Sequence, residues 1–275
     1  MDQLHHAFLS PETQGLQALD NAVRAATCRH DALSWEQLSA TATLVTTRDG
    51  LPLRTIITGR RRITTGTYAS RKAGRSLPYE SMNERAFFMH SEVDTNVVDY
   101  RAQPFRFEFV IGGRRRAYIV DCIRLLADGS IEIVEVKHDP RALQDPDYAE
   151  KLEAVRLICE QVGWRFRIVM KSALLEPEFA FRNVLEVQSW RFTAFDRADE
   201  FLATGLLGQS SMTLDDLACA LGRRTTGDRS NASRALGKAK LKAMMVKRAV
   251  RIDLSKPIDS ETRIELVVDQ PEVTQ

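Results

Sequence analysis

The chain has few cysteines, and the four it has stand far apart. No two of them form a C-x-x-C pair, so the sequence spells out neither a zinc site nor a disulfide framework. No apolar run approaches the roughly 18 residues that a membrane span needs. The first residues lack the basic and apolar regions of a secretory signal. We therefore expect a cytoplasmic protein with no membrane contact.

Acidic residues are missing from two long stretches. Residues 51–75 hold seven Arg and Lys but no Asp or Glu, and residues 222–256 hold eleven Arg and Lys against two Asp. Of the 39 basic residues, 30 are Arg, whose planar head group suits forked contacts with phosphate. Two solvated faces would account for this segregation, and so would two surfaces that neutralise the phosphates of a nucleic acid.

The length of 275 residues suggests about two domains, and 44% apolar with 28% charged residues is typical of a globular protein. Residues 1–50 indicate an N-terminal helical segment, with a capping box at Ser34 and Gln37. Residues 51–172 indicate an α/β domain, and residues 173–275 a separate C-terminal module.

Hydrophobic periodicity and turn signals predict the elements of the α/β domain. Gly112-Gly113 and Asp128-Gly129 are hairpin turn signals, and Gly163 is typical of a helix end. The expected order is a helix over 80–92, strands over 103–111, 115–126 and 131–137, a helix over 147–162 and a strand over 164–170. This helix, three-strand meander, helix, strand order describes a compact α/β core.

The C-terminal module has the pattern of a helix-turn-helix with a wing. Thr213 can cap a short helix that runs to Gly222, and residues 231–245 form a basic second helix. Residues 246–254 and 262–268 can pair as a β-wing. We therefore predict a winged-helix-like fold for this module.

The residues with the clearest chemistry are Asp121 and Glu135-Val136-Lys137, which fall on consecutive strands. Side chains alternate along a strand, so Glu135 and Lys137 share one face and Val136 takes the other. A hairpin between the strands can bring Asp121 beside Glu135. Two carboxylates held this way suit a hard cation such as Mg²⁺, and the lysine can orient a water molecule or stabilise charge on a phosphate.

A simpler explanation is an exposed edge strand that ends in a surface ion pair, worth under about 1 kcal/mol. The strand over 131–137 is apolar on both faces, however, and such strands are usually central in a sheet. A charged pair at that position calls for a function, and the set is that of a phosphodiester hydrolase.

These residues, in this order of elements, resemble the PD-(D/E)xK, or restriction-endonuclease-like, nucleases. Further stretches are similar to the TnsA family, the endonuclease subunits of heteromeric cut-and-paste transposases. These stretches are Tyr68–Arg75, Glu80–Glu84, Val97–Pro104 and Ala142–Asp145. The resemblance implies an α/β, restriction-endonuclease-like core followed by a winged-helix-like domain. It covers residues 68–170 well and residues 1–50 poorly.

The resemblance also implies roles for individual residues. Glu84 takes the place of the family's helix-borne glutamate, Asp121 that of its metal-binding aspartate and Lys137 that of its catalytic lysine. Glu135 fills the position before x-Lys, and with Val136 it completes the expected metal-binding set. Glu80, one helical turn from Glu84, is the alternative helix carboxylate.

The activity implied by the family is cleavage of DNA at the 5′ ends of a transposon with Mg²⁺ or Mn²⁺, two ions in all. The implied partners are transposon-end DNA, a DDE transposase that cuts the 3′ ends, and an AAA+ ATPase regulator. Expected DNA contacts come from the basic residues Arg71, Lys72, Arg75, Arg114, Arg115, Arg116, Arg234, Lys238 and Lys242. Gln103 and His138 are weaker candidates: Gln103 is equally well explained as a ladder residue, and His138 is better explained as a loop residue.

Two alternatives use the same residues differently. A free-standing restriction or repair nuclease would cut DNA without partners. A winged-helix DNA-binding scaffold would carry an inactive nuclease core, although the intact set of Asp121, Glu135 and Lys137 speaks against it.

Overall fold

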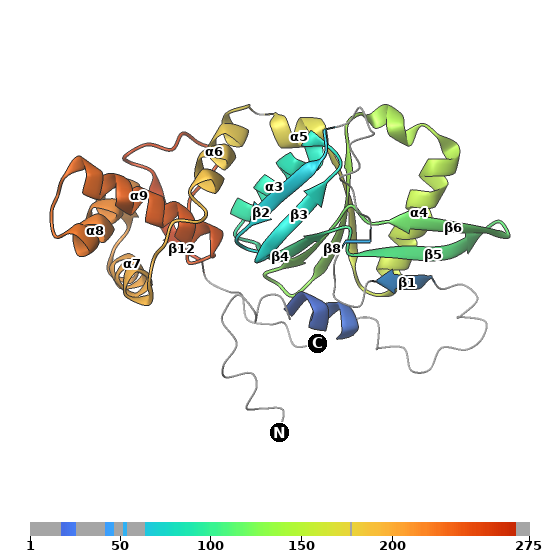
Figure 1. Cartoon of the computed structure of the whole chain (residues 1–275), viewed down its shortest axis with the longest axis horizontal. Coiled ribbons are helices and arrows are strands. Elements are labelled where there is room, and N and C mark those ends of the chain that lie inside the picture. Colours follow the sequence, from blue (N-terminus) through green and yellow to red (C-terminus); the bar gives the residue numbers. More distant parts are fainter. Residues whose placement is uncertain (1–17, 26–41, 47–51, 54–63, 177, 268–275) are drawn as a thin grey trace, which may run out of the picture. The chain divides into compact units, whose positions relative to one another are not determined.

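The fold is that of a computed structural model, which describes residues 18–25, 42–46, 52–53, 64–176 and 178–267 (Figure 1). The expected capping box at Ser34 lies outside these residues. The chain divides into two compact units, one of residues 1–88 with 97–174 and one of residues 89–96 with 175–275. Within the described ranges, no helix has the length and apolar character that crossing a membrane requires.

The first unit mixes strands and helices. Its strands are β1 (Thr43–Thr46), β2 (Gly66–Ser70), β3 (Arg75–Tyr79), β4 (Val97–Ala102), β5 (Phe105–Ile111), β6 (Arg114–Ile119), β7 (Cys122–Leu126), β8 (Ile131–Lys137) and β9 (Arg165–Met170). Its helices are α3 (Met82–Val93), which continues into the second unit, the 3₁₀ turn η3 (Pro140–Leu143), α4 (Pro146–Gln161) and α5 (Lys171–Leu175); residues 18–25 are also helical.

One long β-hairpin bends from one sheet into another. Strands β5 and β6 pair in a sheet of order β1-β5-β6, and their continuations β4 and β7 pair in a sheet of order β4-β7-β8-β9. Both arms bend at the same level, where the N–H of Gln103 donates to the carbonyl of Asp121 at 3.0 Å. Pro104 has no N–H to donate, and Gln103 takes a φ of 45°. We call this point the corner.

The corner corrects the expectation of one strand over residues 115–126. That stretch is two strands, β6 and β7, which belong to different sheets and meet at Val120–Asp121. Periodicity continues through the bend, so the sequence pattern alone gives no break. The expected central position of the strand over 131–137 is confirmed, because β8 lies between β7 and β9.

The four-stranded sheet carries one helix on each face. Apolar residues of α4 pack with those of β5, β7 and β8 in a cluster that includes Trp164 and Leu19. On the other face, the α3 residue Phe88 packs against Tyr100 of β4 at a ring distance of 6.0 Å. The described N-terminal residues therefore belong to this core, and residues 43–46 form strand β1 rather than a helix.

The second unit is built from helices and short strands. Its elements after α5 are α6 (Glu178–Ser189), α7 (Arg197–Gln209), β10 (Met212–Thr213), α8 (Leu214–Thr226), α9 (Asn231–Val246), β11 (Val250–Arg251) and β12 (Arg263–Leu266). Thr213 caps α8 as expected, and β11 pairs with β12 in antiparallel fashion. β10 adds a third strand to this pair, and α6 and α7 were not expected from the sequence.

A buried ion network joins three helices of this unit. Asp199 of α7 is fully buried, and its carboxylate accepts from Arg224 of α8 at 2.7 Å and from Lys240 of α9 at 2.6 Å. Burial alone would raise the pKa of Asp199, but the two cations hold it at about 2. Removal of Asp199 would leave the buried ammonium of Lys240 without its carboxylate partner.

Helices α8 and α9 cross at backbone distance. A Cβ on Gly237 would lie 1.9 Å from the carbonyl oxygen of Ala218, and a Cβ on Gly222 would lie 2.1 Å from that of Ser233. Neither oxygen is the end of a flexible side chain, so any substituent would push the helices apart.

We expect Gly237→Ala to lower the free energy of unfolding by roughly 1–3 kcal/mol, because it overpacks this crossing. The matched control is Gly205→Ala on α7, where a Cβ meets nothing within 4 Å. Since alanine favours the helix by about 1 kcal/mol, the control should be neutral or stabilising. Denaturant unfolding of the full chain measures both, and a Gly237→Ala protein as stable as the control would contradict the crossing.

Candidate active site

Asp121 stands at the corner between β6 and β7, with its carboxylate turned to β8. Its Oδ2 accepts from the main-chain N–H of Val136 at 2.9 Å. Cys122 pairs with Val134, so the register continued by one residue sets Asp121 across from Glu135. The bend therefore places an acid against the last residues of the central strand.

Glu135 and Lys137 share one face of β8, as alternation predicted. The ammonium of Lys137 lies 2.5 Å from Oε1 of Glu135. This face is the one that α4 covers, because Tyr148 in the first turn of α4 donates its O–H to the same oxygen at 2.5 Å. Tyr118 of β6 donates its O–H to Oε2. The carboxylate of Glu135 is thus held by three donors and is only 3% exposed.

Glu84 lies in the first turn of α3, and its contacts separate it from Glu80. The helix begins at Met82, so Glu80 precedes it. The expectation that Glu80 and Glu84 share a helical face is therefore wrong. The Glu84 carboxylate instead accepts from the N–H of Glu80 at 2.8 Å and from the hydroxyl of Ser81 at 3.1 Å. The Ser81 hydroxyl accepts in turn from the N–H of Glu84, as in a capping box.

Burial and neighbouring acids raise the pKa of Asp121 and of Glu84. Burial raises the pKa of Asp121 well above its usual value, and the charges of Glu135 and Glu84 raise it further. The Val136 N–H and the Lys137 charge oppose this rise only in part. Burial, followed by the charges of Glu80 and Glu135, also raises the pKa of Glu84. Such strained carboxylates are typical of sites that bind a cation or transfer a proton.

The two tyrosines were not among the residues expected from the sequence. Burial and then the Glu135 charge raise the pKa of both Tyr118 and Tyr148, so both stay protonated and can donate. Tyr118 shares its strand face with the buried phenylalanines of β5, and Tyr148 lies in the first turn of an amphipathic helix. Either pattern alone indicates a core residue, and only the folded chain brings them to Glu135.

The donor set fits a hard divalent cation by its chemistry. Glu84, Asp121 and Glu135 offer carboxylate oxygens whose mutual repulsion a cation would relieve, and Val136 offers a main-chain carbonyl. The buried Oε1 of Gln103, at the same corner, has no hydrogen-bond donor among the described residues. Within those residues, however, no three His, Cys, Asp or Glu side chains are gathered into a ready ligand set. Glu135 and Glu84 are instead turned toward hydrogen-bond donors of the chain itself.

Gln103 and His138 flank the acids. The Nε2 of Gln103 donates to Oε1 of Glu80 at 3.1 Å, which connects the segment just before α3 to the corner. The Nδ1 of His138, an exposed residue just after β8, lies 3.3 Å from the Nδ2 of Asn83. Neither side chain contacts Asp121, Glu135 or Lys137 in the described hydrogen bonds.

The basic residues expected to contact DNA lie on several elements. Arg71 and Lys72 sit in the turn between β2 and β3, and Arg75 begins β3. Arg114, Arg115 and Arg116 follow the Gly112-Gly113 turn of the β5–β6 hairpin, which projects from its sheet (Figure 1).

The basic residues of α9 are held by acids. Arg234 and Lys238 lie 3.5 and 2.9 Å from Asp215 of α8. Lys242 is only 8% exposed, and its ammonium lies 2.7 Å from Glu186 of α6. This placement gives Lys242 a structural contact within its unit rather than an accessible charge.

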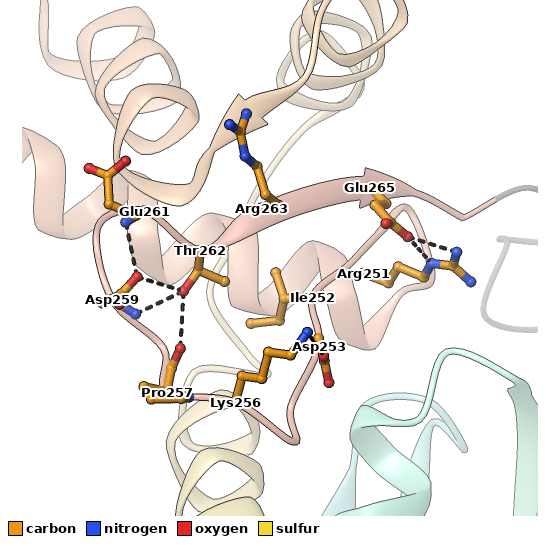
Figure 2. Close-up of a pocket in the computed structure, with 10 residues that line it drawn as sticks. All are labelled: Arg251, Ile252, Asp253, Lys256, Pro257, Asp259, Glu261, Thr262, Arg263 and Glu265. Atoms are coloured by element: carbon orange, nitrogen blue, oxygen red, sulfur yellow. Dashed lines mark hydrogen bonds and ion pairs between the residues drawn. The ribbon is translucent and has the colours of Figure 1, made fainter.

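A hollow of about 690 Å³ lies beside β11 and β12 (Figure 2). Its charged groups neutralise one another: Arg251 binds Glu265 at 2.7 Å, and Lys256 lies 3.0 Å from Asp253. The hydroxyl of Thr262 bonds the carboxylate of Asp259 and the carbonyl of Pro257. The lining holds four acids and three cations, a formal net charge of −1, and its paired groups offer nothing that would rival the acids at the corner.

We expect Asp121→Asn to raise the melting temperature at pH 7.5. The raised pKa of Asp121 means that the folded state, above that pKa, holds a charge that it disfavours relative to the unfolded chain. Asparagine removes the charge and keeps an oxygen for the Val136 N–H. A gain of 1 kcal/mol corresponds to roughly 2–4 °C.

The control for this prediction is Asp128→Asn in the β7–β8 turn. Hydrogen bonds from Ser130, the largest favourable cause, and the Arg165 charge lower the pKa of Asp128, so its charge stabilises the fold and its loss should lower the melting temperature. The difference between the variants should vanish as the pH falls and both carboxyls become protonated. An Asp121→Asn protein that melts below the wild type at pH 7.5 would contradict the electrostatic description of the site.

Comparisons with known proteins bear on this same region. Residues 94–171, which contain Asp121, Glu135 and Lys137, match the family described as TnsA-like endonuclease N terminal. The chain matches no curated protein. The resemblance stated from the sequence motifs is confirmed for this region: residues 94–171 are similar to the TnsA-like endonucleases.

Proposed function

We propose that this chain is a metal-dependent DNA endonuclease that cuts at the 5′ ends of a transposon, together with a DDE transposase and an AAA+ regulator. One observation supports the proposal: a bent hairpin sets Asp121 beside the central strand that carries Glu135 and Lys137, within residues 94–171 that match an endonuclease family. Glu84, which precedes that region, is near enough for its charge to raise the pKa of Asp121. The transposon ends as substrate and the two protein partners are inferred from the family resemblance.

In this proposal Glu84, Asp121, Glu135 and the main-chain carbonyl of Val136 hold Mg²⁺ or Mn²⁺. A divalent ion held there would lower the pKa of a water molecule and polarise a phosphoryl oxygen. Lys137 offers a cation in contact with Glu135, where it can orient the attacking water and stabilise charge on the scissile phosphate. The raised pKa of Asp121 and Glu84 implies that activity should increase with pH above the usual carboxyl range, because the ligands must be ionised.

The β5–β6 hairpin supplies a path for the DNA backbone. Side chains alternate along β6, so Arg114, Arg116 and Tyr118 share one face, and Tyr118 reaches Glu135. Arg115 stands on the other face, opposite the exposed Val110. We expect Arg114 and Arg116 to lead the phosphate backbone toward the acids.

The second unit is proposed to be a winged-helix-like module, with domain limits near residues 51–172 and 173–275. Helices α8 and α9, followed by the paired β11 and β12, have the order of such a fold. Arg234 and Lys238 on α9 are its proposed DNA contacts. In the protein without DNA, both side chains pair with Asp215.

Asp121→Ala and Lys137→Ala should each abolish strand cleavage while leaving DNA affinity near that of the wild type. The first removes a proposed metal ligand, and the second removes the cation beside Glu135. Nicking of supercoiled plasmid in Mn²⁺ measures cleavage, with the chain alone and with the DDE transposase, and fluorescence anisotropy measures DNA affinity. The control is Asp128→Ala, an exposed acid outside the site.

Retained cutting by either variant refutes the assignment. Vigorous cutting by the wild-type chain alone, abolished in both variants, would favour a free-standing nuclease instead.

The double variant Arg114→Ala, Arg116→Ala should weaken DNA binding and flatten its salt dependence. Each arginine that no longer neutralises a phosphate lowers the slope of log affinity against log salt by about 1, so a decrease of about 2 is expected. The control is Arg106→Ala, whose guanidinium on the other face of the hairpin is paired with Glu108. An unchanged slope in the double variant would exclude the hairpin as a DNA-binding element.

A further inference from the structure

The backbone of Tyr148 is held in place, because the residue lies in the capped first turn of α4. Asp145 caps α4, and its carboxylate accepts from the N–H groups of Asp147 and Tyr148 at 3.0 and 3.4 Å. Pro146 occupies the first helical position, where its fixed φ favours the helix. The Tyr148 side chain therefore extends from a rigid stretch of backbone.

Tyr148 contacts both polar residues of β8. Its O–H donates to Oε1 of Glu135 at 2.5 Å, and the Nζ of Lys137 lies 4.6 Å from the centre of its ring. The same Nζ lies 2.5 Å from the same Oε1. Three side chains thus form a closed triangle, in which the aromatic face and the carboxylate both attract the ammonium.

A lysine side chain loses much rotational freedom when it is held in one geometry. Lys137 is 21% exposed, so solvent alone would leave its ammonium free to move. The rigid ring and the buried carboxylate restrict it before substrate binds. Such restriction matters for a catalytic group, because misplacement of a reacting group slows the reaction steeply.

We propose that Tyr148 is a positioning residue for Lys137: its ring holds the ammonium, and its hydroxyl holds the carboxylate that pairs with it. Tyr118, which donates to the other oxygen of Glu135, fixes that carboxylate from β6. The inference rests on the proposed nuclease function only for its catalytic consequence, since the position of Lys137 can be observed without cleavage.

The position of Lys137 is tested by NMR on the full chain labelled with ¹³C at the lysine ε-carbon. Protons held over an aromatic face shift upfield, so Lys137 and Lys151 should both give shifted signals, since Lys151 Nζ lies 4.8 Å from the same ring centre. Lys137→Met and Lys151→Met assign them. The Lys137 shift should persist in Tyr148→Phe and disappear in Tyr148→Leu. An unshifted Lys137 signal in the wild type would overturn the inference.

The catalytic consequence is tested by single-turnover cleavage and DNA affinity. Loss of a group that orients a catalytic side chain typically costs 10–100-fold, so we expect roughly a tenfold lower rate in Tyr148→Phe and roughly a hundredfold lower rate in Tyr148→Leu, with DNA affinity unchanged. Lys151→Met is the control: it removes the other cation on the ring and should cleave at the wild-type rate. Melting temperatures establish that each variant is folded.

The two proposals fail in different ways. If the wild type cleaves and both folded Tyr148 variants match its rate, the positioning role is wrong and the nuclease function stands. If the wild type cleaves no DNA with its partner present, the nuclease function is wrong, and the NMR signals alone decide whether Tyr148 holds Lys137.

Discussion

The burial of carboxylates beside other acids is the constraint on which the rest of this site depends. Asp121 and Glu84 are each placed where burial and a neighbouring acid oppose ionisation. The fold tolerates them by surrounding them with donors from its own chain: a main-chain N–H for Asp121, a serine hydroxyl for Glu84, and two tyrosines with a lysine for Glu135. A cluster of this kind costs stability, and the cost is understandable where a cation or a reaction benefits from it.

The corner is the backbone feature that makes this arrangement possible. A straight hairpin would carry Asp121 on along its own sheet, whereas the bend at Gln103 and Pro104 turns β7 into the sheet of β8. The acid then stands at the junction of two sheets, beside the central strand and at the base of the projecting β5–β6 hairpin. One bend thus relates the acids to the basic hairpin.

Local signals in the sequence predicted α3, the elements from β5 to β9 except η3, and the helices and wing strands α8, α9, β11 and β12, but not β1 to β4, α5 to α7 or β10. Glycines at 112, 113, 129 and 163 all take positive φ, so the turns and the end of α4 were readable from residue type. The split at Asp121 depends on how its partner strand bends, which no periodicity along residues 115–126 records. Helix α3 starts at Met82 because Ser81 caps it, and Glu80 therefore lies outside the helix.

The candidate site was predictable to the extent that its residues follow one another along strands. The alternation of Glu135, Val136 and Lys137 sufficed to place two side chains on one face. Tyr118 and Tyr148 could not be found in this way, because their contact with Glu135 joins residues 17 and 13 positions away in sequence. Likewise, the basic residues of α9 looked alike in sequence, and only burial distinguishes Lys242 from Arg234.

The close crossing of α8 and α9 has a consequence for recognising relatives of the second unit. The outer surfaces of these helices can diverge freely, but the two contact points admit no side chain larger than hydrogen without separating the backbones. A pair of glycines fifteen positions apart (237 minus 222) is therefore a fingerprint that should outlast overall similarity. Distant chains that keep this spacing would share the same interhelical distance even where every surrounding residue has been replaced.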